Sequence, residues 1–311
     1  MAKLSKAKTA IEQLAQDFYD YLLIEKNRSA KTKVNYEHYL RRFFAFASIT
    51  DPKDITPEVV RKYRLYLNSL KNAKSNGLKK QTQIYHLIAV RSFLKYLAKR
   101  DIATLSPEKI ELGKMPSRAI QFMDENELTR LLKSPTGEDL RGLRDTAILE
   151  TLFSTGIRVS ELSSLNRDSI DFSRGEFTVR GKGDKLRVAF LSEKAKGTIR
   201  KYLDKREDIE EALFIRIPKS SSFSGENMTR LTNRSIERLI KKYTARAGIA
   251  KKITPHSLRH QFATDLLRNG ADIRSVQALL GHSHITTTQI YTHVTDETLR
   301  EVHKKFHGKK K

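Results

Sequence analysis

The sequence contains no cysteine, no long apolar segment and no common nucleotide-binding loop. Without cysteine, neither a disulfide nor a metal site with thiolate ligands can form. No run of about 18 apolar residues is present, and the first residues lack the apolar part of a secretion signal, so we expect a soluble cytoplasmic protein. The absence of a G-x-x-x-x-G-K-[ST] loop gives no support for ATP hydrolysis. Paired carboxylates that would indicate a two-metal nuclease are also absent.

Positive charge is what the sequence has in excess. The chain carries 60 Lys and Arg against 36 Asp and Glu, a net charge of +24 at pH 7. Residues 1–115 hold 23 basic and 11 acidic side chains and residues 116–311 hold 37 and 25, so each part has a net charge of +12. Because the excess is not confined to a tail, we expect both parts to contact a polyanion such as nucleic acid. A basic surface that only keeps the protein soluble is the alternative.

The first hundred residues predict a compact unit of four helices. Apolar residues recur at three- and four-residue steps over residues 9–25, 30–47, 56–70 and 82–99. Short connections between such helices are typical of an all-α bundle. Its exposed basic faces suggest DNA contacts, although solvated surface residues would give the same pattern. The candidate DNA-binding side chains are Lys33, Arg41, Lys80 and Gln81.

The periodicity is lost over residues 101–122, which contain prolines and a glycine. We therefore predict an N-terminal domain over residues 1–105, a linker over residues 106–122 and a C-terminal domain over residues 123–311.

The C-terminal part predicts several helices and one β-hairpin. Helical patterns cover residues 140–154, 232–247, 254–267, 272–280 and 296–306. Residues 176–191 alternate as a hairpin, with Phe177, Val179, Leu186, Val188 and Phe190 expected on one face. The β-branched run around residue 290 favours a strand by propensity alone.

Residues 254–293 concentrate side chains suited to phosphate chemistry. His256, Arg259 and His260 lie within five residues, and His282 and Tyr291 follow. An arginine fork matches phosphate oxygens, and histidine exchanges protons near neutral pH. Tyrosine is a nucleophile once its proton is removed. This set can handle a phosphodiester without a metal ion.

Two other positions allow both a structural and a functional interpretation. Arg158 and Glu161 share a helix face, so Glu161 either orients the arginine for a phosphate or forms a buried ion pair with it. Lys182 lies in the predicted hairpin turn, where it is either solvated or able to reach a DNA groove.

The stretches TGIRVSEL, VRGKGDKLRVAFL and TPHSLRHQFATDLLRNGADIRSVQALLGHSHITTTQIYTHV together resemble the tyrosine recombinases, in particular the Xer branch. The resemblance implies a mainly α protein. A four-helix SAM-like domain would bind the core DNA, and an α-helical catalytic domain would carry a small antiparallel sheet. It also implies that the segment around Tyr291 is helical, against its propensity.

The resemblance assigns roles residue by residue. Tyr291 would attack the DNA and form a 3′-phosphotyrosyl link, Lys182 would protonate the 5′-oxygen, and His256 would assist deprotonation of Tyr291. Arg158, Arg259 and His282 would stabilise the phosphate, with Glu161 supporting Arg158. No cofactor, metal ion or ATP is expected.

The resemblance also implies partners and a biological role. Family members act as tetramers on two double-stranded DNA sites, here either a homotetramer or a heterotetramer with a paralogue, and a DNA translocase is a possible regulator. The segment TDETLREVHKKF would dock on a neighbouring subunit. The expected role is the resolution of chromosome dimers through a Holliday junction before cell division. The alternatives are a mobile-element integrase, a type IB topoisomerase and a DNA-binding protein without catalysis.

Overall fold

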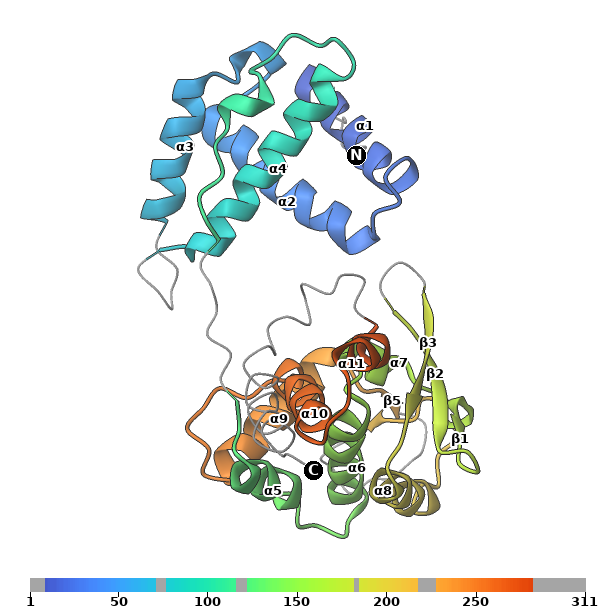
Figure 1. The fold of residues 1–311 in the computed structure, drawn as a ribbon. Helices are drawn as coiled ribbons and strands as arrows, with labels where there is room; N and C mark the ends of the chain where they lie inside the picture. Colours follow the sequence, from blue (N-terminus) through green and yellow to red (C-terminus); the bar gives the residue numbers. More distant parts are fainter. Residues whose placement is uncertain (1–8, 71–76, 116–121, 182–184, 218–227, 282–311) are drawn as a thin grey trace, which may run out of the picture. The chain divides into compact units, whose positions relative to one another are not determined.

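The computed structural model describes residues 9–70, 77–115, 122–181, 185–217 and 228–281. The chain divides into two compact units, Met1–Arg118 and Ala119–Lys311, called here the N-terminal and C-terminal units (Figure 1). Lys182, His282, Tyr291 and the helix expected over residues 296–306 lie outside the described residues.

The described residues of the N-terminal unit form four α-helices, as predicted. Ser29 accepts a hydrogen bond from the Thr32 N–H and caps the second helix, and Thr56 caps the third in front of Pro57. Two short 3₁₀ helices follow the second and fourth α-helices. The elements are α1 (Ala10–Ile24), α2 (Ala30–Ala47), η1 (Pro52–Asp54), α3 (Pro57–Ser69), α4 (Lys80–Ala98) and η2 (Pro107–Lys109).

Aromatic side chains fill the core of this unit. Phe18 of α1 and Phe93 of α4 are fully buried, with their ring centroids 5.5 Å apart in an edge-to-face arrangement. The fully buried Tyr63 hydroxyl lies 2.8 Å from Nδ1 of His86, which is also fully buried. Helix α4 therefore presents both an apolar and a polar contact to the other helices.

In its described part, the C-terminal unit is mainly helical with two small antiparallel sheets, which confirms the predicted fold class. Its first sheet has the order β1-β2-β3, and β4 pairs with β5. Helix α8 and strands β1, β4 and β5 were not predicted from the sequence. The elements are α5 (Glu125–Lys133), α6 (Leu140–Thr155), α7 (Val159–Ser164), η3 (Arg167–Ser169), β1 (Ile170–Asp171), β2 (Glu176–Arg180), β3 (Leu186–Phe190), α8 (Glu193–Asp204), β4 (Ile215–Arg216), β5 (Thr229–Arg230), α9 (Asn233–Arg246), α10 (Pro255–Arg268) and α11 (Ile273–Leu280).

Helix α6 lies at the centre of this unit. It packs against both α8 and α10, and its residues Ile148, Leu149 and Leu152 are fully buried (Figure 1). The end of α6 at Gly156 therefore lies beside α10.

The predicted face of the hairpin is wrong. Phe177 pairs with Ala189 and Val179 pairs with Arg187, and directly opposed residues project on the same face. The apolar residues of β3 therefore face away from Phe177 and Val179. They are largely exposed: Leu186 by 58%, Val188 by 42% and Phe190 by 52%.

Candidate active site

Arg158 stands at the sharp junction between α6 and α7. Gly156 ends α6 with a positive φ of 58°, and Arg158 is the residue that precedes α7. Its Nη1 donates to Oε1 of Glu161 at 2.7 Å, and its backbone N–H donates to Oε2 at 2.7 Å. The Glu161 side chain is only 3% exposed, whereas that of Arg158 is 27% exposed. The buried carboxylate thus fixes a guanidinium that still reaches solvent.

Hydrogen bonds from Arg259 connect α10 with the C-terminal ends of α6 and α11. This arginine projects from α10, donates from Nη1 to the Gly156 carbonyl at 2.7 Å and from Nη2 to the Leu280 carbonyl. The adjacent carbonyl of Gly281 accepts from Nη2 of Arg158 at 3.4 Å. The ends of α6 and α11 therefore bring the two arginines to one place.

His256 lies one helical turn before Arg259 on α10. Desolvation of its ring, followed by the charges of Arg259 and Arg158, lowers the pKa of His256 below its usual value. The ring is therefore neutral at pH 7 and able to accept a proton. Burial and the nearby His256 and Arg259 also lower the pKa of His260, to about 4.

Gly181 and Gly281, which precede Lys182 and His282 in the sequence, both lie at the edge of this site. A β-carbon on Gly181 would lie 3.7 Å from Nη1 of Arg158, and the Gly281 carbonyl contacts Nη2 of the same arginine. Of the predicted catalytic residues, the structure brings together Arg158, Glu161, His256 and Arg259. Lys182, His282 and Tyr291 themselves lie outside the described residues.

Arg187 of β3 also belongs to this cluster, and sequence reasoning missed it. Its Nη2 donates to Oε2 of Glu161 at 2.7 Å, and its side chain is 9% exposed. The available signal was an arginine on the same face of the hairpin as Val179, where an apolar residue would be expected.

The four candidate DNA-binding residues lie on α2 and α4 of the N-terminal unit. Lys33 pairs with Asp20 at 3.4 Å, and Lys80 is exposed at the start of α4. Gln81 donates to the Tyr85 hydroxyl at 2.9 Å. All four candidates therefore belong to one unit, whereas the arginine cluster belongs to the other.

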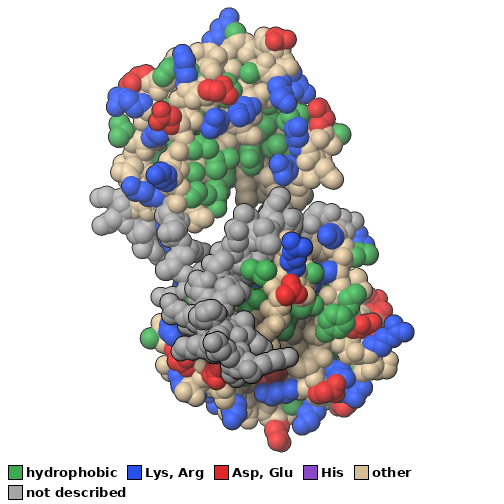
Figure 2. Space-filling model, in the orientation of Figure 1, with side chains coloured by type: hydrophobic (Ala, Val, Ile, Leu, Met, Phe, Trp, Pro, Cys, Tyr) green, Lys and Arg blue, Asp and Glu red, His purple; other side chains and the backbone are tan. Residues whose placement is uncertain are grey.

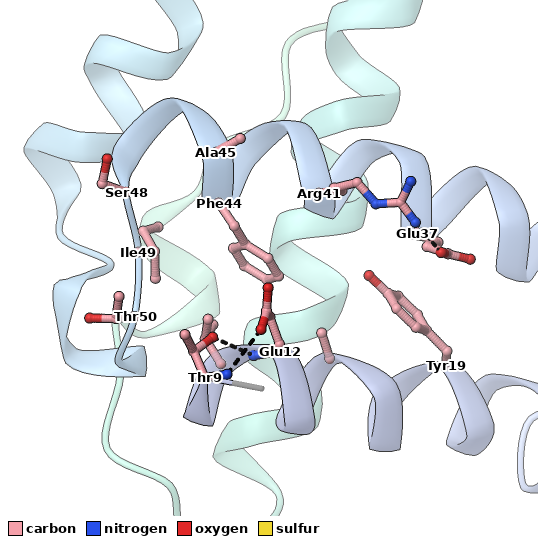
Figure 3. Close-up of a pocket in the computed structure, with 12 residues that line it drawn as sticks. Thr9, Glu12, Tyr19, Glu37, Arg41, Phe44, Ala45, Ser48, Ile49 and Thr50 are labelled. Atoms are coloured by element: carbon pink, nitrogen blue, oxygen red, sulfur yellow. Dashed lines mark hydrogen bonds and ion pairs between the residues drawn. The ribbon is translucent and has the colours of Figure 1, made fainter. Parts of the chain in front are cut away.

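Arg41, like Lys33, already pairs with an acidic side chain. Its guanidinium bonds to Glu37 on the rim of a groove of about 380 Å³ between α1 and α2 (Figure 3). The hydroxyl of Tyr19 points into the same groove. Arg41 is therefore a weaker candidate for a phosphate contact than the exposed Lys80.

Basic side chains are spread over both units. The visible face in Figure 2 shows Lys and Arg on each unit, interspersed with fewer Asp and Glu.

Within the described ranges, no three His, Asp or Glu residues form a cluster that would hold a metal ion. No helix within those ranges has the length and apolar character needed to cross a bilayer.

Comparison with known proteins identifies the two units. Residues 121–298 match the phage integrase family, and residues 15–101 match the N-terminal SAM-like domain of phage integrases. The chain is 35% identical over 292 residues to tyrosine recombinase XerC of Thermodesulfovibrio yellowstonii, covering 94% of this chain and 95% of that protein. It is 36% identical over 301 residues to tyrosine recombinase XerD of Listeria monocytogenes, covering 96% and 99%.

Solved structures show the same fold. The XerA recombinase structure is 32% identical, covers 96% of this chain and 99% of its own, and superimposes with a TM-score of 0.52. The XerH site-specific recombinase bound to a palindromic difH substrate is 20% identical, covers 96% and 90%, and has a TM-score of 0.68.

Proposed function

The chain belongs to the phage integrase family of site-specific tyrosine recombinases, and we propose that it cuts and rejoins DNA through a covalent link to Tyr291. The observation that carries this proposal is the placement of two guanidiniums, Arg158 and Arg259, beside the neutral imidazole of His256. We assign DNA binding to residues 1–105 and catalysis to residues 123–311. Residues 106–122 are the linker between these two domains.

The cleavage step is a transesterification. The Tyr291 oxygen attacks the scissile phosphorus while His256 accepts the phenol proton, and the bond from phosphorus to the 5′-oxygen breaks. Lys182 donates a proton to that oxygen, which leaves as a 5′-hydroxyl. Attack by the 5′-hydroxyl of a second strand reverses the step, so the bond energy is kept and no ATP is consumed.

The arginines stabilise the charge that develops on the phosphate. Arg158 and Arg259 donate to the non-bridging oxygens, with His282 as a further donor. Removing one such donor typically raises the barrier by roughly 2.7–4 kcal/mol. Since both guanidiniums are already held by backbone carbonyls and Glu161, little reorganisation is required when DNA binds.

The biological role we propose is the resolution of chromosome dimers by a tetramer on two DNA sites. Relatives about 35% identical over nearly the whole chain are named XerC and XerD, which favours this role over integration of a mobile element. The tetramer would consist of this chain alone or of this chain with a paralogue, with a DNA translocase as a possible regulator.

A nicked suicide substrate tests the chemistry. The substrate carries a candidate chromosomal recombination site, and the protein–DNA adduct is detected on a denaturing gel in the presence of EDTA. We expect an adduct with the wild type and none with Tyr291→Phe, which should retain DNA binding in a mobility-shift assay. An adduct that persists in Tyr291→Phe would refute the assigned nucleophile.

A second assay separates the rival functions. Relaxation of supercoiled DNA that lacks any specific site would indicate a type IB topoisomerase. Recombination only between the ends of a mobile element would indicate an integrase. Recombination between two chromosomal sites supports the proposed role.

A further inference from the structure

Glu161 is shared by two arginines from different elements. Its Oε1 accepts from Nη1 of Arg158, and its Oε2 accepts from the Arg158 backbone and from Nη2 of Arg187, each at 2.7 Å. The carboxylate is almost completely buried, with 3% of its side chain exposed. A buried carboxylate with two cationic partners leaves the cluster with one net positive charge.

The side chain of Arg187 is largely enclosed, and its hydrogen bond is made to Glu161. Only 9% of its side chain is exposed, and Gly281 packs so closely that a β-carbon there would lie 2.7 Å from its Cδ. No acceptor among the described residues bonds to its Nε or Nη1. A buried cation with so few hydrogen bonds lowers stability, so we look for a functional reason for its charge.

That reason follows from the charge balance. If Arg158 were the only partner of Glu161, the two would form a neutral pair, and the arginine would attract a phosphate weakly. With Arg187 present, Glu161 is neutralised from the buried side. The exposed edge of Arg158 then keeps an uncompensated positive charge.

We propose that Arg187 is a positioning residue that neutralises Glu161, and so keeps Arg158 oriented and positively charged for the scissile phosphate. This inference rests on the proposed role of Arg158 in cleavage. Arg187 also connects β3 to Arg158, since the strand that follows Lys182 in the sequence contacts the same carboxylate.

The test compares Arg187→Gln with a control in which the same arrangement occurs away from the site. Asp208 is a buried carboxylate shared by two arginines: its Oδ1 lies 2.5 Å from Nη2 of Arg206 and 2.9 Å from Nη2 of Arg167. Arg167→Gln therefore removes one of two cationic partners from a buried carboxylate without touching Arg158.

Single-turnover cleavage of the nicked substrate and affinity for the uncleaved site are measured for each variant. We expect Arg187→Gln to slow cleavage by about 10- to 100-fold, by analogy with the loss seen when a residue that orients a metal ligand is removed. Its DNA affinity should change much less than its cleavage rate, because we assign Arg187 to positioning Arg158 and not to a DNA contact. Arg167→Gln should cleave at the wild-type rate even if its melting temperature falls equally.

A double variant separates charge from packing. In Glu161→Gln combined with Arg187→Gln, the carboxylate that needs neutralising is gone, so cleavage should be faster than in Arg187→Gln alone. A purely structural role predicts no such recovery, because the double variant breaks more contacts. Arg187→Lys keeps the charge and should retain most of the activity.

Several outcomes overturn the proposal. A cleavage rate in Arg187→Gln equal to that of the wild type would do so. So would a loss of cleavage rate in Arg167→Gln as large as that in Arg187→Gln. If Arg187→Gln does not fold, a folded Arg187→Lys that cleaves as poorly as Tyr291→Phe contradicts the charge argument. The wild type is the reference: if it forms no adduct, the proposed function fails, whereas equal adducts in wild type and Arg187→Gln contradict only the role of Arg187.

Discussion

The ring of Phe262 lies directly against Gly156, so that a β-carbon on residue 156 would come within 2.3 Å of its Cδ1. Gly156 also has a φ of 58°, a conformation that costs other residues roughly 1–2 kcal/mol. Its carbonyl anchors Arg259, and Arg158 follows two residues later. The close contact between α6 and α10 thus sets the positions of both arginines.

Gly156→Ala should damage both stability and cleavage. The clash with Phe262 adds to the backbone strain, and we expect a loss of more than about 2 kcal/mol, with cleavage lowered beyond what unfolding explains. Gly248→Ala is the control, because Gly248 has a φ of 67° and its β-carbon would meet nothing within 4 Å. Denaturant unfolding that shows equal losses for the two variants would contradict the role of Phe262.

Arg259→Lys should lower the cleavage rate by about 10²–10³-fold, because one ammonium cannot bind two carbonyls and a phosphate as a planar fork does. Single-turnover cleavage measures this effect. Arg130→Lys is matched to it, since Arg130 also donates to a backbone carbonyl, that of Ala247 at 3.2 Å, but on an exposed surface. A cleavage rate in Arg259→Lys close to that of Arg130→Lys would show that the fork is not required.

The lowered pKa of His256 predicts the pH dependence of cleavage. A base with a depressed pKa is active above that pKa and loses activity as the pH falls through it. The rate should therefore be flat near pH 7 and decline only on acidification below the ordinary histidine range. His256→Gln should be slower by about 10²-fold or more and should lose this decline. A wild-type rate that keeps rising through pH 7 would point to a different base.

His86 makes the N-terminal unit sensitive to acid. Burial, together with the charges of Arg42 and His38, lowers the pKa of His86 to about 4, against about 6.5 in the unfolded chain. The unfolded state then binds one more proton between these values, so stability falls as the pH drops from about 6.5 to about 4, by roughly 3 kcal/mol in total. Unfolding of His86→Gln, measured across this range, should show a weaker decline than wild type. Parallel curves for the two proteins would exclude His86 as the cause.

Salt dependence of DNA binding distinguishes Lys80 from Arg41. Each phosphate contact contributes about 0.9 to the slope of log K against log salt concentration. Lys80→Ala should make that slope shallower by about 0.9, the contribution of one phosphate contact. Arg41→Ala should change the slope less, because Glu37 already pairs with Arg41. The reverse order would mean that the Arg41–Glu37 pair opens on DNA.

Local signals in the sequence predicted most of the helices well. The helices predicted over residues 30–47, 56–70 and 254–267 correspond to α2, α3 and α10, which Ser29, Thr56 and Thr254 cap. Helix α8 was missed although Ser192 caps it and Ala195, Ile199 and Tyr202 are buried at helical spacing. The sequence therefore does carry a local signal for α8.

Tertiary contacts explain the other errors. The face of β3 depends on its register with β2, and an alternating pattern alone does not fix that register. Sequence spacing could suggest that Glu161 supports Arg158, but not that Arg187, which comes 26 residues later, shares the same carboxylate. Such a shared partner becomes visible only when the strand is placed beside α7.

The carbonyls that hold the two arginines stand at helix C-termini. Gly156 ends α6, and Leu280 and Gly281 end α11, so the partial negative charge of two helix dipoles falls on the guanidiniums. This field offsets the mutual repulsion of neighbouring cations while no DNA is bound. Because main-chain atoms supply it, this field does not depend on the charge or polarity of any side chain in the two helices, provided that both helices stay packed in place.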